Sequence, residues 1–227
     1  MDDMLLKLDN LPESRAKLPM YHNIKITVNV DISLNGYISG PGGKRVVISD
    51  RVDLERVNDL RAKSDAILVG ANTIVNDNPE LKIHDSTNRK HARIVLDRKL
   101  KIPESSNVLD GTCRTMIFTS NAKRKLKGAD LVIMNDDSLG IGNIMAKIEE
   151  TGIGSLLVEG GSIVINEFIS ERIIDDFFIY IGNVILPEDG IKLFRPNMEI
   201  RNIIVERKNF GEGILLRIDP LKLVSNA

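Results

Sequence analysis

Apolar and polar residues first alternate along the chain at residues 24–30, where isoleucine or valine occupies every second position. This period of two, in a stretch rich in β-branched residues, predicts a strand. Residues 50–63 change to helical spacing, and Asp50 stands three residues before Asp53 at the expected start of this helix. Short apolar runs then predict further strands at residues 65–70, 93–97, 115–119 and 131–134.

The second half of the chain continues this alternation before it changes character. A helix is predicted near residues 144–150, with Gly152 after its end, and is followed by a strand at residues 155–158 and a helix at residues 162–174. The tail contains three segments that we expect to form antiparallel strands, at residues 177–186, 203–207 and 214–218.

Short apolar strands that alternate with helices indicate a mostly parallel sheet covered on both faces, and the antiparallel tail makes the sheet mixed. We therefore expect one α/β domain over residues 23–227. Residues 1–22 are predicted to be a polar extension interrupted by Pro12 and Pro19.

Composition narrows the classes of partner. Among 227 residues, the 31 Lys and Arg nearly cancel the 32 Asp and Glu, so global charge does not favour a nucleic acid or an anionic membrane. No apolar run reaches the ~18 residues that a membrane span needs. A single cysteine, Cys113, excludes an internal disulfide and a Cys-rich zinc site. The acidic start is unlike a secretory signal, and we expect a cytoplasmic protein.

Candidate chemistry lies in the loops that leave the carboxyl ends of the strands, where open α/β sheets bind ligands. In residues 159–162, Gly160 and Gly161 would let backbone N–H groups at a helix start approach a phosphate. Glu159 would repel a phosphate but could accept hydrogen bonds from sugar hydroxyls. The alternative is a tight turn in which Glu159 only caps the backbone.

Two further loops carry polar pairs. Thr73 and Asp77 are four residues apart, so a helical turn would place them on one face, where they could hold a carboxamide and a ribose. The alternative is a short capped helix that ends at Pro79. Asp97 and Arg98 follow a strand and could bind a ribose hydroxyl and a 2′-phosphate, or could form a solvated charged turn.

The histidines and one arginine complete the candidates. His22, His84 and His91 lack the spacing of metal ligands, so we expect no metal site. We expect His22 and His91 at the surface, and His84 could contact an anion. Arg61 is either a solvent-facing charge or a phosphate partner. A basic stretch at residues 123–127 is predicted to be helical.

Taken in order, these motifs resemble the riboflavin-biosynthesis reductases over about residues 24–220. The stretches that carry the resemblance are Ser-Leu-Asn-Gly from Ser33, Leu-Arg-Ala from Leu60, residues 65–81, Arg-Ile-Val-Leu-Asp from Arg93, and Leu-Leu-Val-Glu-Gly-Gly from Leu156. The resemblance implies a dihydrofolate-reductase-like three-layer fold, usually paired as a homodimer. It also implies NADPH-dependent reduction of 2,5-diamino-6-ribosylamino-4(3H)-pyrimidinone 5′-phosphate to the ribitylamino compound.

Site residues follow from the resemblance position by position. Those implied for NADPH are Thr73, Asp77, Val95, Leu96, Asp97, Arg98, Gly160, Gly161, Ser162 and Ile163. Those implied for the substrate are Ser33, Arg61, Leu81, His84 and Glu159, of which Glu159 is the candidate catalytic residue. The chain departs from the family pattern at Asp31, where a small residue is usual, at Asn35 and Asn78, where aspartate is usual, and at residues 183–190, which lack a Gly-rich ending.

Two other functions remain open from the sequence. One is another NADPH reductase on the same fold, acting on a pterin, a folate or a carbonyl compound. The other is a nucleotide-binding protein without catalysis. A deaminase is excluded, because its zinc site needs a Pro-Cys-x-x-Cys motif that one cysteine cannot supply.

Overall fold

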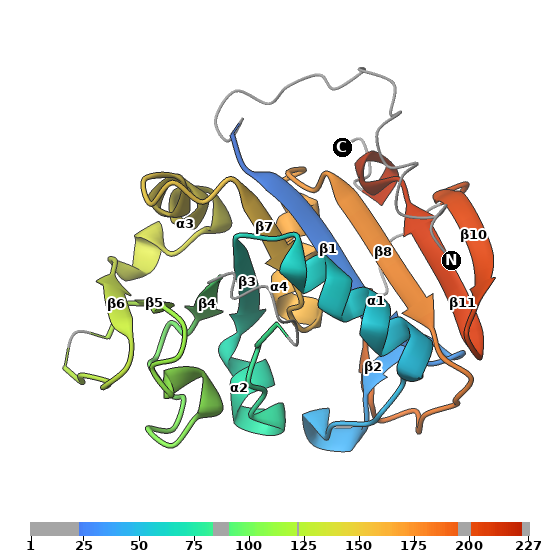
Figure 1. Ribbon diagram of the computed structural model, residues 1–227, viewed down its shortest axis with the longest axis horizontal. Helices are drawn as coiled ribbons and strands as arrows, with labels where there is room; N and C mark the ends of the chain where they lie inside the picture. The colour runs from blue at the N-terminus through green and yellow to red at the C-terminus, as the bar shows by residue number, and fades with distance from the viewer. Residues whose placement is uncertain (1–22, 84–90, 122, 195–200, 224–227) are drawn as a thin grey trace.

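The computed structural model describes residues 23–83, 91–121, 123–194 and 201–223, and its centre is a nine-stranded sheet (Figure 1). The strand order is β10-β11-β8-β1-β7-β3-β4-β5-β6, and every pair from β8 through β6 is parallel. β11 runs antiparallel to β8, and β10 antiparallel to β11, so the sheet is mixed as expected. The strands are β1 (Lys25–Ile32), β3 (Ala66–Gly70), β4 (Ala92–Leu96), β5 (Thr115–Thr119), β6 (Asp130–Ile133), β7 (Ser155–Val158), β8 (Asp176–Ile181), β10 (Ile204–Phe210) and β11 (Gly213–Ile218).

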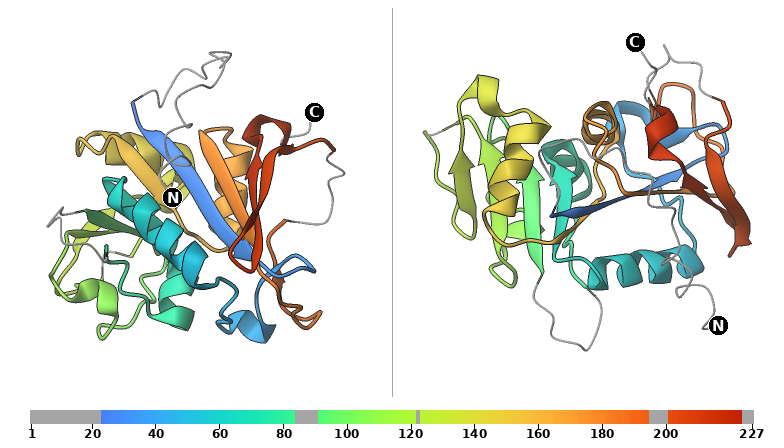
Figure 2. Two further views of the ribbon diagram at one scale, coloured as in Figure 1. Left: turned by 45° about the vertical axis from the view of Figure 1, so that its right-hand side comes forward. Right: turned by 90° about the horizontal axis from the view of Figure 1, so that it is seen from above.

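Helices cover both faces of this sheet, which confirms the three-layer expectation (Figure 2, right). The helices are α1 (Arg51–Ala62), α2 (Ala71–Asp77), α3 (Ile141–Glu149) and α4 (Ser162–Ser170). α3 and α4 pack their apolar residues on one face, whereas α2 contributes Ala71 and Ile74 to a second core on the other face. α1 shares that second face but buries mainly the charged residues Asp53 and Arg56. No helix in the described ranges is long and apolar enough to cross a membrane.

Most element boundaries agree with the sequence. Residues 115–119 and 155–158 are strands, and Asp50 caps α1 by accepting a hydrogen bond of 2.8 Å from the backbone N–H of Asp53. The antiparallel pair at the tail is also confirmed, because β10 and β11 form a hairpin.

Three expectations were wrong. The helix expected at 162–174 ends at Ser170, because Arg172 adopts a left-handed backbone with φ of 57°. The strand expected at 177–186 ends at Ile181, where the chain turns away at Gly182. Residues 123–127 form no helix, and Leu126 is buried in the core on the face of α2.

A small second sheet, not anticipated from the sequence, joins two loops near the end of β1. It pairs β2 (Tyr37–Ser39) with β9 (Ile191–Lys192). Asn35 adds a side-chain connection: its Nδ2 donates to the carbonyl of Leu186 (2.7 Å), and its Oδ1 accepts from the N–H of Leu186 (3.1 Å). An aspartate could not make both bonds, so this departure from the family pattern has a structural role here.

Candidate active site

Parallel strands bring their following loops to one edge of the sheet, and the residues singled out from the sequence meet there. β1 leads to Ser33, β3 to α2, β4 to Asp97 and β7 to Glu159. In Figure 1, the arrowheads of β3 and β8 point to this edge, at the lower side of the view. Each loop therefore lies beside loops that are distant in sequence.

The central contact at this edge is a bidentate ion pair between α1 and the residue after β7. Nε of Arg61 donates to Oε1 of Glu159 (2.8 Å) and Nη2 donates to Oε2 (2.6 Å). The side chains are 21% and 11% exposed, respectively, so the pair is largely shielded from water. A guanidinium in this geometry fixes the orientation of the carboxylate. The two residues expected to face the substrate thus lie together.

A second arginine of α1 is buried against the sheet and was not singled out from the sequence. Nε of Arg56 donates to Asp53 (2.8 Å), and Nη2 donates to Oδ1 of Asn29 in β1 (2.8 Å). The guanidinium carbon also lies 6.0 Å from the centre of the Phe178 ring. The available signal was the spacing of three between Asp53 and Arg56, which places the two on one helix face.

Asp31, at the end of β1, lies in the same charged cluster. Its carboxylate accepts a short hydrogen bond from the hydroxyl of Ser49. Burial raises the pKa of Asp31 to about 7, and the neighbouring carboxylates of Asp53 and Glu159 act in the same direction. This departure from the family pattern therefore places an acidic group with a raised pKa close enough to Glu159 for the two charges to interact.

The start of α4 offers backbone N–H groups without a competing side chain. Its N-cap is Gly161, so no side chain caps the helix, and Ser162 and Ile163 form its first turn. A Cβ added at Gly161 would meet no atom within 4 Å, whereas one at Gly160 would lie 2.7 Å from Cβ of Val164. Gly160 is thus required by packing, and the space beside Gly161 is open to a ligand.

Thr73 and Asp77 both lie on α2 and are half-buried. Oδ1 of Asp77 is buried without a hydrogen-bond partner among the described residues, and burial raises the pKa of this carboxyl. α2 ends at Asp77, and the residue after it, Asn78, has a left-handed backbone (φ 42°) and accepts two hydrogen bonds from Asn107. The short capped helix is therefore present, and it also brings Thr73 and Asp77 within one turn of each other.

The loop after β4 differs from the expectation for Asp97. This residue is 2% exposed, and its Oδ2 accepts a hydrogen bond of 2.9 Å from the backbone N–H of Ile102. Its carboxylate thus stabilises a turn rather than facing open space. Arg98 is half exposed, and its Nη1 bonds the backbone and side chain of Asp136 (both 2.9 Å). Beside them, Leu96 is half-buried and Val95 is fully buried in the core.

The remaining substrate candidates are less accessible than expected. Ser33 is fully buried, and its hydroxyl accepts from the N–H of Tyr37 and donates to Asn35. Leu81 is 3% exposed and has a left-handed backbone with φ of 49°. His91 was expected at the surface but is buried, and its Nε2 lies 2.6 Å from the carbonyl oxygen of Leu81. His84 and His22 lie outside the described residues.

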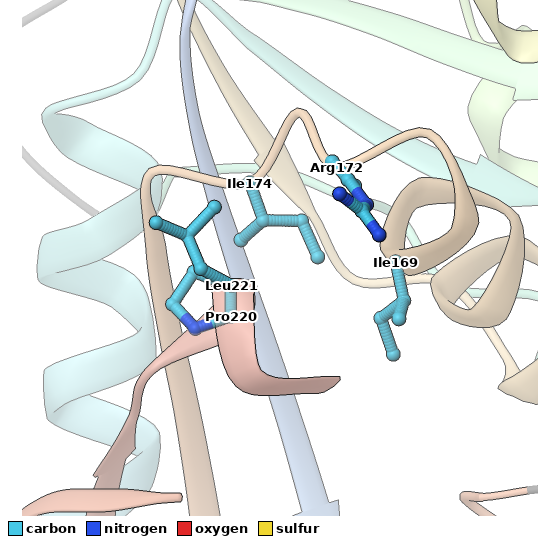
Figure 3. A pocket seen from close by; sticks show the side chains of 5 residues that line it. All are labelled: Ile169, Arg172, Ile174, Pro220 and Leu221. Carbon is cyan, nitrogen blue, oxygen red and sulfur yellow. The ribbon is translucent and has the colours of Figure 1, made fainter. Parts of the chain in front are cut away.

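Two surface pockets lie at the opposite edge of the sheet, near the amino ends of the parallel strands. Figure 3 shows the smaller, where the end of α4 meets the residues before β8 and the 3₁₀ turn Pro220–Leu223. The larger is open and runs past the starts of β4, β5 and β6, beside His91 and Cys113. Neither contains the ion pairs described above, so we place the candidate site at the carboxyl edge on chemical grounds.

Comparison with known proteins identifies relatives of this chain. The family model of the RibD C-terminal domain matches residues 24–216. The 2,5-diamino-6-ribosylamino-4(3H)-pyrimidinone 5′-phosphate reductase of Archaeoglobus fulgidus is 29% identical over 177 residues, which cover 71% of this chain and 81% of that protein. The riboflavin biosynthesis protein RibD of Aquifex aeolicus is 29% identical over 204 residues, covering 84% of this chain and 56% of its own length.

Solved structures extend the comparison to the fold. The deaminase/reductase of Thermotoga maritima superposes with a TM-score of 0.76 at 24% identity, covering 87% of this chain and 57% of that one. The riboflavin biosynthesis reductase Rib7 of Saccharomyces cerevisiae gives a TM-score of 0.68 at 22% identity, covering 86% and 88%. The chain thus spans a little over half of the bifunctional proteins and most of the single reductases. The dihydrofolate-reductase-like α/β expectation is confirmed at the level of the fold.

The two glycines at the start of α4 should differ in what they tolerate. In Gly160→Ala the new Cβ would crowd Val164, and we expect the free energy of unfolding to fall by about 1–3 kcal/mol. In Gly161→Ala the new Cβ would meet open space, and we expect only the loss of less than about 1 kcal/mol that alanine causes at an N-cap. Urea unfolding of the two variants beside the unmodified protein measures both. Equal losses in the two variants would contradict this assignment.

Proposed function

The chain belongs to the RibD C-terminal domain family, and from this membership we propose that it reduces 2,5-diamino-6-ribosylamino-4(3H)-pyrimidinone 5′-phosphate with NADPH. Three relatives that carry the name of this reductase are 29%, 28% and 27% identical to the chain. The observation that supports the proposal best is the Arg61–Glu159 pair beside the uncapped start of α4. It combines a sugar-binding acid, a cation and an anion-binding helix start in one place.

On this proposal, the substrate lies against the end of β7 and the last turn of α1. Glu159 accepts hydrogen bonds from ribose hydroxyls, and Arg61 holds its carboxylate in the required orientation. The guanidinium of Arg61 also attracts the phosphate of the substrate. His84 remains a proposed phosphate contact, and Ser33 and Leu81 shape the site through their backbone rather than through their buried side chains.

The residues at the carboxyl edge fit NADPH in two respects. The open space beside Gly161 lets the N–H groups of residues 161–163 bind a pyrophosphate, and exposed Arg98 suits the 2′-phosphate. We assign Thr73 and Asp77 to the nicotinamide ribose and carboxamide. When bound, NADPH supplies the hydride that reduces C1′ of the substrate. The protein positions the two reactants, an effect that can contribute ~7–11 kcal/mol.

We propose further that two copies of the reductase unit, residues 23–227, form a homodimer in the cytoplasm. The apolar strand β8 lies inside the sheet between β11 and β1, so it has no free edge for the contact. β10 is instead an exposed edge strand, where Ile204 and Val205 are 51% and 59% accessible. No oligomer contact is assumed for the other edge strand, β6.

The function is tested by following NADPH oxidation with the ribosylaminopyrimidinone phosphate, beside dihydrofolate and a simple aldehyde. We expect turnover with the pyrimidinone and a strong preference for NADPH over NADH. In Arg98→Gln, loss of a charge-assisted bond of about 1.5–3 kcal/mol should raise the KM for NADPH about tenfold or more and leave NADH unchanged. Arg114→Gln, which removes an exposed ion pair at the opposite edge, is the matched control.

Other outcomes of this assay favour the alternatives. Turnover only with dihydrofolate or the aldehyde would indicate another reductase on this fold. NADPH binding with no turnover of any substrate would indicate a nucleotide-binding protein. A KM for NADPH that Arg98→Gln leaves unchanged would remove Arg98 from the cofactor site.

Glu159→Gln tests the substrate side. Glutamine keeps the shape of the side chain but loses the charge, so we expect kcat/KM for the pyrimidinone to fall about tenfold or more, in line with a charged hydrogen bond. The Kd for NADPH, measured by fluorescence, should stay within about twofold because Arg61 faces Glu159 and not α4. Glu171→Gln, exposed after the end of α4, is the control. If kcat/KM for the pyrimidinone and the affinity for NADPH fall by the same factor, Glu159 does not belong to the substrate site.

The dimer is tested by Val205→Lys in β10, which we expect to shift the sedimenting mass from two copies to one because a charge would be desolvated in the contact. Ile133→Lys in β6 is the matched edge-strand control. Unmodified protein that sediments as one copy at micromolar concentration would refute the homodimer.

A further inference from the structure

In one cluster of ionisable side chains beneath α1, negative charges outnumber positive charges. Three carboxylates, those of Asp31, Asp53 and Glu159, share this region with two guanidinium groups, those of Arg56 and Arg61. Nε and Nη2 of Arg61 both donate to Glu159. Arg56 donates to Asp53 and to the side-chain amide oxygen of Asn29. Asp31 forms no ion pair among the described residues. One negative charge is therefore left without a cation in contact.

The oxygen atoms of the two aspartates differ in their hydrogen-bond partners. Oδ2 of Asp31 accepts from Ser49, and Oδ1 of Asp53 accepts from Arg56. The other oxygens, Oδ1 of Asp31 and Oδ2 of Asp53, are both buried with no hydrogen-bond partner, although the two side chains lie within hydrogen-bonding reach of each other. Two carboxylate oxygens can bond to each other only through a proton, and one proton would satisfy both.

The surroundings of Asp31 favour the protonated form. Burial is the largest cause of its raised pKa of about 7, the charges of Asp53 and Glu159 add to it, and Ser49 and Arg56 oppose it. Burial also raises the pKa of Asp53. From β8, Tyr180 is the register partner of Asp31, but its hydroxyl donates to Asp50 instead. The other nearby cations are Arg61, which interacts with Asp31 at longer range, and Lys208, which lies near Arg56.

We propose that Asp31 and Asp53 share one proton, and that this acid pair supplies the proton consumed in the reduction. The second part rests on the function proposed above. Asp31 lies near the end of β1, three residues beyond Val28, which is in register with Val158 at the end of β7, and the charge of Glu159, the proposed sugar contact, acts on it. Oδ1 is buried, but the residue as a whole keeps some exposed surface. The acid therefore lies on the same side of the site as the proposed position of the ribose.

The chemistry balances with one proton and one hydride. The proton of Asp31 passes to the ring oxygen O4′ of the ribosylamine, and the bond between C1′ and O4′ breaks. This leaves a 4′-hydroxyl and an iminium at C1′. With NADPH bound, C1′ would accept a hydride with its two electrons, which would give the neutral ribitylamine and leave the cofactor oxidised. Asp31 is left as a carboxylate and takes a proton from water before the next turnover.

The direction of the pH effects follows from the raised pKa. The acid form is required, so the rate of hydride transfer should fall as pH rises through the pKa of Asp31. In the unfolded chain an aspartate has a pKa of about 3.9, so at intermediate pH the folded state binds more protons. The free energy of unfolding should therefore fall as pH rises between the two pKa values.

Asp31→Asn is the decisive variant, because its amide can donate to Oδ2 of Asp53 as the protonated acid does but cannot release a proton. Single-turnover hydride transfer should slow about 100-fold or more and lose its decline at alkaline pH. The Kd values for NADPH and for the pyrimidinone should change by less than threefold. Between about pH 5 and about pH 8, the free energy of unfolding measured with urea should fall more for the unmodified protein than for the variant. Asp130→Asn, which alters an exposed carboxylate at the opposite edge, is the control.

Each contrary result overturns one part. An unchanged rate and pH profile in Asp31→Asn would show that the pair is structural and not the acid of the reaction. Parallel unfolding curves against pH would show that no proton is shared. If the unmodified protein does not turn over the pyrimidinone, the proposed function fails, and the unfolding measurement still decides whether the proton is shared. If Asp31→Asn does not fold, Asp31→Ala, which leaves Asp53 paired with Arg56, is measured in the same way with the same expected loss of pH dependence.

Discussion

Helix α1 is attached to the sheet by arginine side chains rather than by an apolar face. Arg56 reaches Asn29 in β1, and Arg61 reaches Glu159 at the end of β7. Buried charges are tolerated only when each has a partner with good geometry, so these contacts fix the helix in register with both strand ends. The positions of the candidate sugar contact and of the neighbouring aspartates all follow from this constraint.

The two halves of the site are built on different physical principles. On the proposed cofactor side, Gly70 and Gly160 both lack the Cβ that would meet Val164 at less than 3.0 Å, so the starts of α2 and α4 can approach closely. On the proposed substrate side, charged groups in hydrogen-bonded pairs lie under α1. Tight apolar contact suits a rigid frame for a large common cofactor, whereas paired charges suit a polar sugar phosphate. The division corresponds to the two reactants of the proposed reaction.

The sequence predicted the parallel core well because buried strands are continuous apolar runs, as at residues 115–119 and 155–158. It predicted α1 because Asp50 and Asp53 mark a helix start. It could not show that α1 turns a charged face inward, since apolar periodicity carries no information about paired charges. Nor could it show that the carboxylate of Asp97 bonds Ile102, or that His91 is buried against Leu81, because both contacts depend on how loops fold back.

The sequence indicated which motif residues belong to the candidate site, but it did not show what each of them contacts. The Gly160-Gly161 pair indicated an accessible helix start, and the structure gives the two glycines different reasons for lacking a side chain. Arg61 and Glu159 were singled out separately, 98 residues apart in the chain, and only the fold shows them as one unit. Asp31 was noted as unusual, but its meaning depends on Asp53, which the sequence had assigned only to a helix start.

Asn35, four residues beyond Asp31, bears on how the site would respond to a change in pH. Its amide holds the loop at Leu186 through one donated and one accepted hydrogen bond, and an amide does not ionise at any physiological pH. On the proposal that Asp31 and Asp53 share a proton, the chain places a carboxyl group of raised pKa near a tether that cannot change charge. A drop or rise in cellular pH would alter the charge beneath α1 while the loop anchored at Leu186 stays in place, so the response would be one of reactivity and not of shape.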